Sequence, residues 1–260
     1  YSPCRVQGLS DHTKNNTVIT IAVSLGVKYI ERHFKLKDND SPDNAFSLNP
    51  NEWQEMNNTI KEAEMILGGY GKTIMDNDVK CFALGETLLG AGRGAEIVLG
   101  ITLGTGLGAG LVINNKLYRG NTGAAGELGH MTIKFDGPKC SCSNPGCFEE
   151  YGSQRFFKKT RYSPKELGVR ARGGDKRALN VFKEYGRYLG IGLGNAINIL
   201  DPEVIVLGGG IANVFHFFIK EAQKQIKKIV ISPLAKRQVN IKKSKLGDFA
   251  GAIGAACLLW

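Results

Sequence analysis

The 260-residue sequence lacks the features that mark several special classes of protein. No stretch approaches the roughly 18 consecutive apolar residues of a membrane-spanning helix, so we expect a soluble chain without a membrane partner. A charged and then apolar leader is missing, as is a Met before Tyr1, so we expect no signal peptide and a fragment or processed chain. The 42% hydrophobic and 22% charged residues exclude a disordered or collagen-like protein and suit about two domains, or one larger one.

Cysteine is too sparse for a secreted disulfide scaffold. The chain has six cysteines, and three of them, Cys140, Cys142 and Cys147, fall within eight residues. Disulfide scaffolds are shorter and richer in cysteine, whereas reduced thiols are typical of the cytosol. We therefore expect a cytoplasmic protein with one thiolate cluster.

Acidic residues are scarce relative to basic ones, and the net charge of +10 could indicate a nucleic-acid partner. Residues 216–245 hold nine basic residues against a single acid. Here apolar side chains recur at helical spacing, at Phe215, Phe218, Ala222 and Ile226. This spacing predicts an amphipathic helix with a solvated lysine face. We expect no nucleic-acid partner.

Before residue 70 the pattern alternates between helix and strand. Residues 17–25 predict an apolar helix, and residues 27–34 alternate like a strand. Residues 49–67 predict a second helix, with Asn49 as its N-cap and Pro50 as its first residue. This alternation implies parallel strands.

After residue 71 the sequence becomes rich in glycine, and we place a boundary near residue 70 that gives domains 1–70 and 71–260. Two β-branched runs within 95–114 flank a glycine-rich turn. The other expected elements are a short strand within 72–79, helices over 81–89 and 178–200, a buried strand within 203–210 and a small-residue helix over 249–259.

The sharpest chemical signal is GELGH at 126–130 followed by CSCSNPGC at 140–147. His130, Cys140, Cys142 and Cys147 offer one imidazole and three thiolates, a suitable set for tetrahedral Zn²⁺. The alternatives are chance clustering or a disulfide, although a Cys-x-Cys pair is awkward for one. Four protein ligands leave no position for water, so such a zinc would be structural.

Two glycine-rich turns follow predicted strands. Glycine lets a backbone approach a phosphate and point amide N–H groups at it. A glycine-rich connection that binds nothing is the alternative, and the Gly-Lys-Ser/Thr ending of a P-loop is absent. The candidate phosphate-binding residues are Gly104, Thr105, Gly106 and Gly108 in the first turn and Gly208, Gly209 and Gly210 in the second.

Asn77 and Asp78 stand at the end of the short strand expected within 72–79. A carboxylate at the carboxyl end of a strand in an α/β fold is well placed to act as a general base. A turn or helix-cap pair is the alternative interpretation.

Residues from about 71 to 260 resemble the ROK family of sugar kinases and related repressors. The resemblance is carried, in order, by DNDVKCFALGE, ITLGTGLGAG, GAAGELGH, CSCSNPGCFEE, LDPEVIVLGGG and DFAGAIGAA. It implies an α/β fold, with a ribonuclease H-like lobe of the actin/hexokinase type. It also implies ATP and Mg²⁺ as cofactors, a small-molecule sugar as substrate, and a homodimer as the common assembly.

The resemblance further implies roles for individual residues. Asp78 would deprotonate the 6-hydroxyl of the sugar and Asn77 would hold the sugar. Glu127, His130 and Glu149 would bind sugar hydroxyls, with His130 also a zinc ligand. The first glycine turn would hold phosphates and the second would lie on the adenosine side. Zinc would then preorganise the loop that carries the sugar contacts.

One segment of that family is missing from the sequence. The family's N-terminal lobe opens with an Asp-x-Gly-Gly-Thr phosphate loop, and no such segment occurs here. We therefore expect half of the ATP cleft to be absent and turnover to be impaired.

Residues 1–68 resemble the C-terminal barrel part of sialic acid synthases, through GLSDHT, IERHFKLK, SPDNAFSLNPNEW and LGG. The resemblance implies that His12 and His33 match two histidines that bind a divalent metal, Mn²⁺ or Mg²⁺; two isolated histidines could also be ordinary surface or core residues. Asn44 stands where the family has a histidine after Pro-Asp. Since so short a piece cannot close an eight-stranded barrel, we expect a partial (β/α) TIM-barrel fragment with a vestigial metal site and no synthase activity.

The sequence therefore predicts an ATP-dependent kinase that phosphorylates the 6-hydroxyl of a hexose or N-acylhexosamine. N-acetylmannosamine is favoured, within sialic acid biosynthesis, because synthase and kinase use successive metabolites. The alternatives are a phosphoenolpyruvate-dependent synthase remnant and a catalytically dead, zinc-containing sugar-binding module. A sugar-sensing repressor would need a helix-turn-helix, and none is visible before residue 71.

Overall fold

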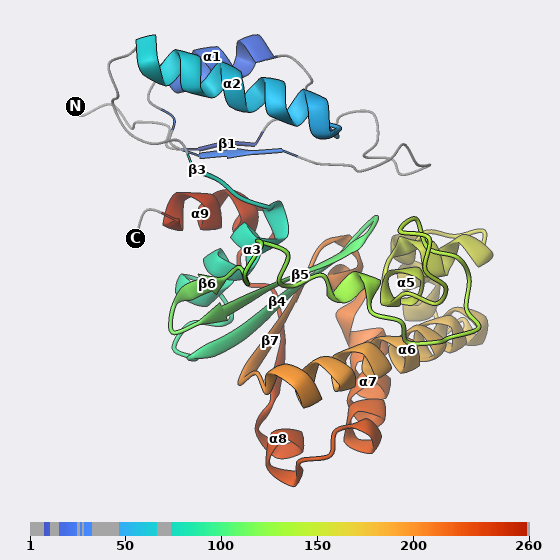
Figure 1. Cartoon of the computed structure of the whole chain (residues 1–260). Coiled ribbons are helices and arrows are strands. Elements are labelled where there is room, and N and C mark those ends of the chain that lie inside the picture. The colour runs from blue at the N-terminus through green and yellow to red at the C-terminus, as the bar shows by residue number, and fades with distance from the viewer. Residues whose placement is uncertain are drawn as a thin grey trace.

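The computed structural model describes residues 8–10, 16–24, 27, 29–32, 47–66 and 74–258. The candidate metal ligands His12 and His33 and the motif at 42–44 lie outside these ranges. Figure 1 shows two sheets, each with its own helices, one above the other. The first sheet is built from parallel strands in the order β1-β2-β3, and the second has the order β6-β5-β4-β7-β8.

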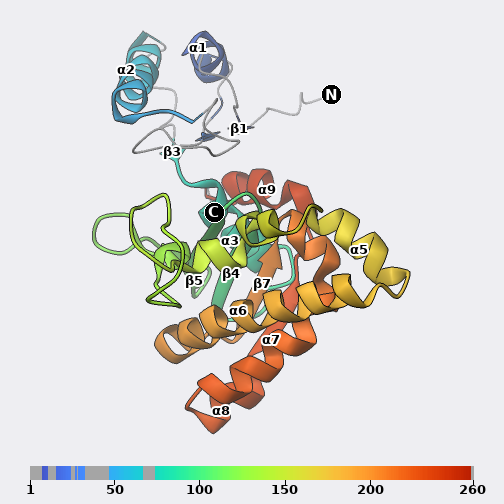
Figure 2. The ribbon, with the colours of Figure 1, turned by 90° about the vertical axis from the view of Figure 1, so that its right-hand side faces the viewer.

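The first sheet consists of three short parallel strands, as the alternation before residue 70 predicts. Leu9 lies opposite Ile30, and Ile30 lies opposite Met75. Figures 1 and 2 show helices α1 and α2 on one side of this sheet, with α9 on the other, and α9 contacts both β1 and β2. The elements are β1 (Gly8–Ser10), α1 (Asn16–Ser24), β2 (Tyr29–Glu31), α2 (Pro50–Ile66) and β3 (Ile74–Met75).

Helix α2 starts where the sequence predicts. The Asn49 side-chain oxygen accepts hydrogen bonds from the backbone N–H groups of Asn51 and Glu52, and the Glu52 carboxylate accepts one from the Asn49 N–H. This reciprocal pair is a capping box, which satisfies donors that a helix start otherwise leaves unpaired. The apolar stripe of α2, including Met56 and Ile60, packs with Ile19 and Ile30 into a small core.

Strand β3 joins the two parts of the chain. It follows residue 70, yet it pairs with β2 of the first sheet. The residues directly after it, Asp76 and Asn77, lead into helix α3 (Asp78–Leu88), which packs on the second sheet. The first sheet therefore includes residues from both sides of the expected boundary.

The second sheet is mixed. Strands β4 and β5 form an antiparallel hairpin, whereas β4, β7 and β8 run parallel. The two β-branched runs and the buried strand expected from the sequence are thus confirmed. The strands are β4 (Ile97–Leu103), β5 (Leu107–Ile113), β6 (Lys116–Tyr118), β7 (Val204–Gly208) and β8 (Asn240–Lys243).

Helices cover both faces of the second sheet, so alternate residues of β4 enter different cores. Leu99, Ile101 and Leu103 pack in the core formed with α6 and α7, whereas Val98 packs with residues of α3 and α9. A strand buried on both faces reads as a continuous apolar run, which is how the sequence of β4 reads. The remaining helices are α4 (Phe148–Gly152), α5 (Pro164–Arg172), α6 (Lys176–Leu200), α7 (Phe215–Ile229), α8 (Pro233–Gln238) and α9 (Ala250–Cys257).

Helix α7 confirms the interpretation of the basic stretch. Phe218, Ala222 and Ile226 are buried, while Lys220 and Lys224 are exposed. Its lysines therefore lie on a solvated helix face, as the spacing predicts. Among the described residues, no helix combines the length and the apolar character that crossing a membrane requires.

Candidate functional site

The predicted zinc ligands come together in space. The metal-binding atoms of His130, Cys140, Cys142 and Cys147 all lie within 4.8 Å of one another. The Cys142 and Cys147 sulfurs are 3.5 Å apart, and the Cys140 sulfur is 3.7 Å from His130 Nδ1. Sulfurs bound to one tetrahedral Zn²⁺ at about 2.3 Å would be about 3.8 Å apart. The four residues therefore have the dimensions of a zinc site.

The pKa values of these thiols are shifted in different directions. Burial raises the pKa of the Cys140 thiol, and burial together with Cys142 raises the pKa of Cys147. Burial acts to raise the pKa of the Cys142 thiol as well. Hydrogen bonds outweigh this effect, above all the one with the Asn144 backbone, and the pKa of Cys142 is lowered overall. A cation supplies the charge that lets buried thiols ionise, because metal binding releases their protons.

The segment that carries Glu127 and His130 lies directly on β5. Gly126 and Gly129 make this possible, because an added Cβ would collide with the Ala109 carbonyl oxygen at Gly126 and with the Leu107 carbonyl oxygen at Gly129. The short 3-10 helix η2 (Leu128–His130) follows Glu127. The Glu127 side chain is exposed and has no hydrogen-bond partner among the described residues.

Glu149 stands at the start of α4 and reaches back to the β4–β5 hairpin. Its Oε2 accepts a hydrogen bond of 3.1 Å from the Leu107 backbone N–H, and its Oε1 is 3.1 Å from Arg155 Nη2. Burial acts to lower the pKa of Arg155, but Glu149 and Glu150 outweigh it and raise that pKa. The Glu149 carboxylate is thus anchored on both oxygens inside the protein.

Asn77 and Asp78 lie at the N-terminal end of α3, where β3 ends. Asn77 is the N-cap, because its side-chain oxygen accepts hydrogen bonds from the Val79 and Lys80 backbone N–H groups. The next side chain, Val79, packs on Gly108 of β5. The interpretation of Asn77 as a helix-cap residue is therefore confirmed. The Asp78 carboxylate has no hydrogen-bond partner among the described residues, so it stays free for another role.

The two glycine turns are neighbours. Gly104, Thr105 and Gly106 connect β4 to β5, and Gly208 pairs in register with Thr102 of β4. Gly209 has φ +79°, and an added Cβ would lie 2.6 Å from the Leu103 carbonyl oxygen. Both turns therefore sit at the carboxyl ends of parallel strands, where α/β proteins bind ligands.

Gly104 and Gly210 differ from the glycines that the fold needs. A Cβ added at either residue would meet no described atom within 4 Å. Their lack of a side chain is therefore not explained by contact with the protein, which leaves room for a ligand against the backbone.

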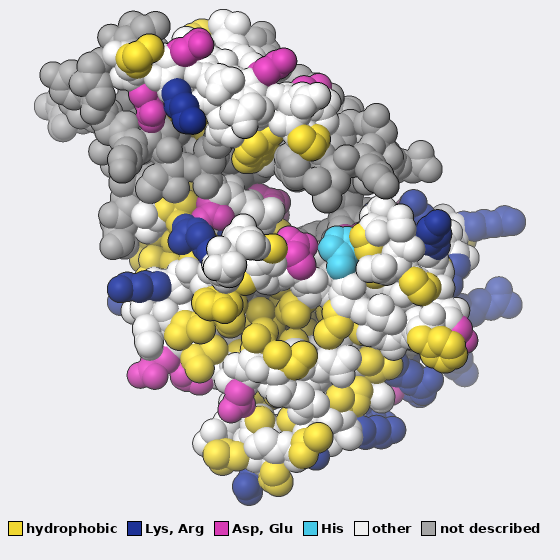
Figure 3. Space-filling model, in the orientation of Figure 1, with side chains coloured by type: hydrophobic (Ala, Val, Ile, Leu, Met, Phe, Trp, Pro, Cys, Tyr) yellow, Lys and Arg dark blue, Asp and Glu magenta, His cyan; other side chains and the backbone are white. Residues whose placement is uncertain are grey.

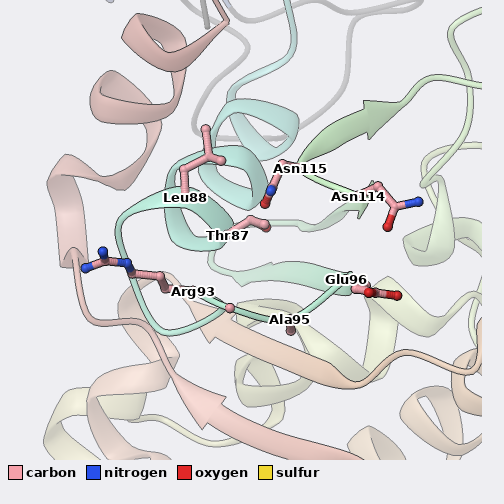
Figure 4. A pocket seen from close by; sticks show the side chains of 8 residues that line it. Thr87, Leu88, Arg93, Ala95, Glu96, Asn114 and Asn115 are labelled. Atoms are coloured by element: carbon pink, nitrogen blue, oxygen red, sulfur yellow. The ribbon is translucent and has the colours of Figure 1, made fainter.

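One pocket of the described residues does not coincide with this site. It has a volume of about 450 Å³ and lies at the start of β4 and the end of β5, the far end of the hairpin from the glycine turn. Figure 4 shows Thr87, Arg93, Glu96 and Asn115 around it. Figure 3 shows instead a histidine and acidic side chains along the hollow between the two parts of the molecule.

Family comparison agrees with the sequence motifs. The sequence model of the ROK family matches residues 69–260, which is 192 of 260 residues. The chain belongs to the ROK family. Residues 1–72 match the model of the NeuB family, which covers the remaining quarter.

Curated ROK relatives include both repressors and kinases. The xylose repressor of Bacillus subtilis is 35% identical over 191 residues, which cover 71% of this chain and 50% of the repressor. The N-acetyl-D-glucosamine kinase of Mannheimia succiniciproducens is 38% identical over 201 residues, which cover 70% of this chain and 65% of the kinase. The chain thus spans about half to two thirds of the length of these relatives.

Structural similarity extends further along the chain. A ROK family glucokinase from Streptomyces griseus, solved with glucose and AMPPNP, has a TM-score of 0.72 and 28% identity, and the match covers 94% of this chain and 86% of that one. Because residues 69–260 are only 74% of this chain, the match includes much of the segment before residue 69. The fold is therefore the α/β actin/hexokinase-like fold of ROK sugar kinases, and the partial TIM barrel stays a prediction.

Two structural groups of this region escaped the sequence analysis. Glu86 of α3 is fully buried and accepts hydrogen bonds from residues 244–246. Arg119, which follows β6, pairs with Asp76. Each group joins residues far apart in sequence, so local spacing does not reveal either pairing. For the second group, the one local signal is that Asp76 is an acidic residue next to Asn77.

Proposed function

We propose that this chain carries the sugar and phosphate sites of an ATP-dependent kinase that phosphorylates the 6-hydroxyl of a hexose or N-acylhexosamine. One observation carries the proposal. The free carboxylates of Asp78 and Glu127 lie on segments that contact β5, at the same end of the sheet as the two glycine turns. Polar groups without partners beside an open glycine backbone suit a sugar next to a phosphate chain.

Asp78 is proposed as the general base. Phosphoryl transfer depends on positioning, on neutralisation of the phosphate charge and on a base for the attacking hydroxyl. Asp78 accepts the proton of the 6-hydroxyl, and the Asn77 side-chain amide nitrogen, free because the cap uses only its oxygen, donates to the sugar. ATP with Mg²⁺ supplies the phosphoryl group and its charge neutralisation when bound. The turn of Gly104, Thr105 and Gly106 holds phosphates, although the Gly104 N–H itself donates to the Gly106 carbonyl oxygen. Gly208 to Gly210 flank the adenosine side.

Glu127, His130 and Glu149 are proposed to bind the other sugar hydroxyls. His130 faces Cys140 with Nδ1, so its second ring nitrogen is left to donate outward. Glu149 Oε2 already accepts one hydrogen bond and Oε1 is ion-paired with Arg155, but each carboxylate oxygen has two lone pairs and can accept a sugar hydroxyl in addition.

Zinc is proposed to be structural. The four ligands His130, Cys140, Cys142 and Cys147 fit a tetrahedral ion, and they fill all four positions. The ion would fix the loop that holds His130 and Glu149, so it would act through preorganisation and not on the reacting atoms.

N-acetylmannosamine is the proposed substrate. The NeuB match of residues 1–72 supports this choice, because a synthase-type and a kinase-type segment in one chain suit successive metabolites. The relatives named glucokinase and N-acetyl-D-glucosamine kinase make glucose and N-acetylglucosamine the competing substrates. The dimer and the metal site at His12 and His33 stay predictions.

A second candidate is a sugar-binding module with little or no turnover. It is favoured by one observation: no Asp-x-Gly-Gly-Thr loop occurs in the 260 residues. We accordingly propose that these residues turn over ATP more slowly than a kinase of this family that has the loop.

The test combines turnover and binding. ADP release is measured with N-acetylmannosamine, N-acetylglucosamine and glucose, and sugar affinity is measured by calorimetry. Asp78→Asn should abolish turnover and leave sugar affinity nearly unchanged, whereas the exposed control Asp248→Asn should change neither. Sugar binding without ADP release in the unmodified chain would favour the binding module, and turnover of glucose alone would exclude the N-acetylmannosamine assignment.

A further inference from the structure

The loop between β6 and η2 is fastened to the start of α3 at two points. Arg119 of this loop binds Asp76, and Lys80 of α3 donates from Nζ to the Gly123 carbonyl oxygen. The loop ends at Glu127, and the segment it grips contains Asn77 and Asp78. The contacts thus join the two segments that supply the candidate sugar ligands.

The geometry between Arg119 and Asp76 is specific. Arg119 Nε and Nη2 both donate to the same carboxylate oxygen, Asp76 Oδ2, at 2.9 and 2.6 Å. The arginine side chain is 47% exposed, whereas that of Asp76 is only 8% exposed. Because water reaches the arginine side of this pair, the attraction is partly screened and contributes about 1 kcal/mol or less to stability. A role in shaping the site explains this close pairing better than a role in holding the fold.

The second carboxylate oxygen of Asp76 connects the Arg119 contact to the backbone of Asn77. Asp76 Oδ1 accepts a hydrogen bond of 2.9 Å from the Asn77 backbone N–H. Asn77 in turn caps α3 through its side-chain oxygen. Held from both sides, the backbone between Asp76 and Val79 fixes the direction in which the Asp78 carboxylate leaves the helix.

The far end of the loop is equally constrained. Gly126 lies so close to the Ala109 carbonyl oxygen that no side chain fits there, and its φ is +98°. The Ala125 N–H donates to the Arg119 carbonyl oxygen, which closes the loop upon itself. A shift of Arg119 would therefore be transmitted to Glu127 as well as to Asp78.

We infer that Arg119 is a positioning residue, which through Asp76 sets the distance between the proposed base Asp78 and the proposed sugar ligand Glu127. This inference rests on the proposed kinase function. A misplacement of about 1 Å can cost about 100-fold in rate. Loss of the Arg119–Asp76 ion pair should therefore act on turnover far more than on folding.

The experiment compares Arg119→Gln with Arg170→Gln in the full chain. Arg170 is a matched control, because it is 45% exposed, pairs with an aspartate at 2.9 Å, and lies on α5 away from the site. Arg119→Gln should lower kcat about 10- to 100-fold and change the KM for ATP by less than about threefold. Arg119→Lys, which keeps the charge but not the paired donors, should give an intermediate loss.

Hydrogen exchange supplies a readout that does not depend on turnover. In Arg119→Gln, amide exchange in a peptide covering residues 76–82 should become faster, while Arg170→Gln should leave it unchanged and both variants should melt at similar temperatures. Unchanged exchange at 76–82, or faster exchange with unaltered kcat, would overturn the inference. If the unmodified chain phosphorylates no sugar, the proposed function fails by itself. The positioning role of Arg119 is then tested by amide exchange at residues 76–82 alone.

Discussion

Glu86 and Ser244, 158 residues apart, are joined by a hydrogen bond of 2.6 Å from the Ser244 hydroxyl to Glu86 Oε1. The Glu86 carboxylate is fully buried, and it also accepts hydrogen bonds from the backbone N–H groups of Ala91, Lys245 and Leu246. A buried charge is tolerated only when its hydrogen-bonding capacity is met, and here four donors surround it. The carboxylate therefore connects the end of α3 to the loop before α9.

Removal of this carboxylate should destabilise the chain strongly. Glu86→Ala would leave three partly buried backbone donors without their acceptor, and we expect a loss of about 3 kcal/mol in the free energy of unfolding. Ser244→Ala removes one donor to Glu86 and the acceptor of the Gly247 N–H, and it should cost about 1–2 kcal/mol. Urea denaturation measures both, with the exposed Glu184→Gln as a control. A loss below about 1 kcal/mol for Glu86→Ala would show that the loop can rearrange to satisfy itself.

The cysteine cluster should bind one zinc ion per chain. Cys147→Ser should abolish zinc in purified protein, as measured by elemental mass spectrometry, because three ligands bind far more weakly than four. Cys257→Ser removes a buried thiol outside the cluster and should leave the zinc in place. Chelation should lower the melting temperature of the unmodified chain and not that of Cys147→Ser. An equal zinc content in both serine variants would contradict the ligand set.

Gly104 and Gly209 should respond differently to alanine. Gly209→Ala forces a side chain at φ +79° against the Leu103 carbonyl oxygen, so it should lower stability. Gly104→Ala meets open space and should leave stability nearly unchanged, yet it should raise the KM for ATP about tenfold or more if phosphate lies against this turn. Gly173→Ala, at an uncrowded helix end, is the control. An unaltered KM for ATP in Gly104→Ala would remove this turn from the phosphate site.

Asp175 should make stability depend on pH. The Arg170 side chain, followed by the backbone N–H groups of Ala178 and Arg177, lowers the pKa of Asp175, which is the N-cap of α6. A lowered folded-state pKa contributes stability that is present above the unfolded pKa of about 4 and is lost as the pH falls through the folded value. The difference in melting temperature between the unmodified chain and Asp175→Ala should therefore be larger at pH 7 than at pH 3. A difference that does not vary with pH would argue against this linkage.

Local sequence rules predicted the elements whose signals are local. Asn49 and Pro50 marked the start of α2, the β-branched runs marked β4 and β5, and the spacing of Phe218, Ala222 and Ile226 marked the buried face of α7. The cluster of His130, Cys140, Cys142 and Cys147 was also predictable, because the three cysteines lie within eight residues and His130 stands ten residues before the first of them.

The rest of the site depends on contacts between distant residues. Nothing near Arg119 in the sequence identifies Asp76 as its partner, and the pairing of β3 with β2 crosses the point where the sequence changes character. Strand β1 is only three residues long with one large apolar side chain, too little for a periodic signal. Such features arise from packing, which composition and spacing do not encode.

The close packing of α3 against α9 has a consequence for how the chain is made. Gly254 of α9 lies against the Cys81 carbonyl oxygen of α3, and Glu86 of α3 accepts hydrogen bonds from residues 244–246. A ribosome delivers α3 long before these partners exist. The helix that begins with Asp78 therefore lacks these partners until residues 244–257 have been synthesised, and its apolar face stays uncovered by them during that interval.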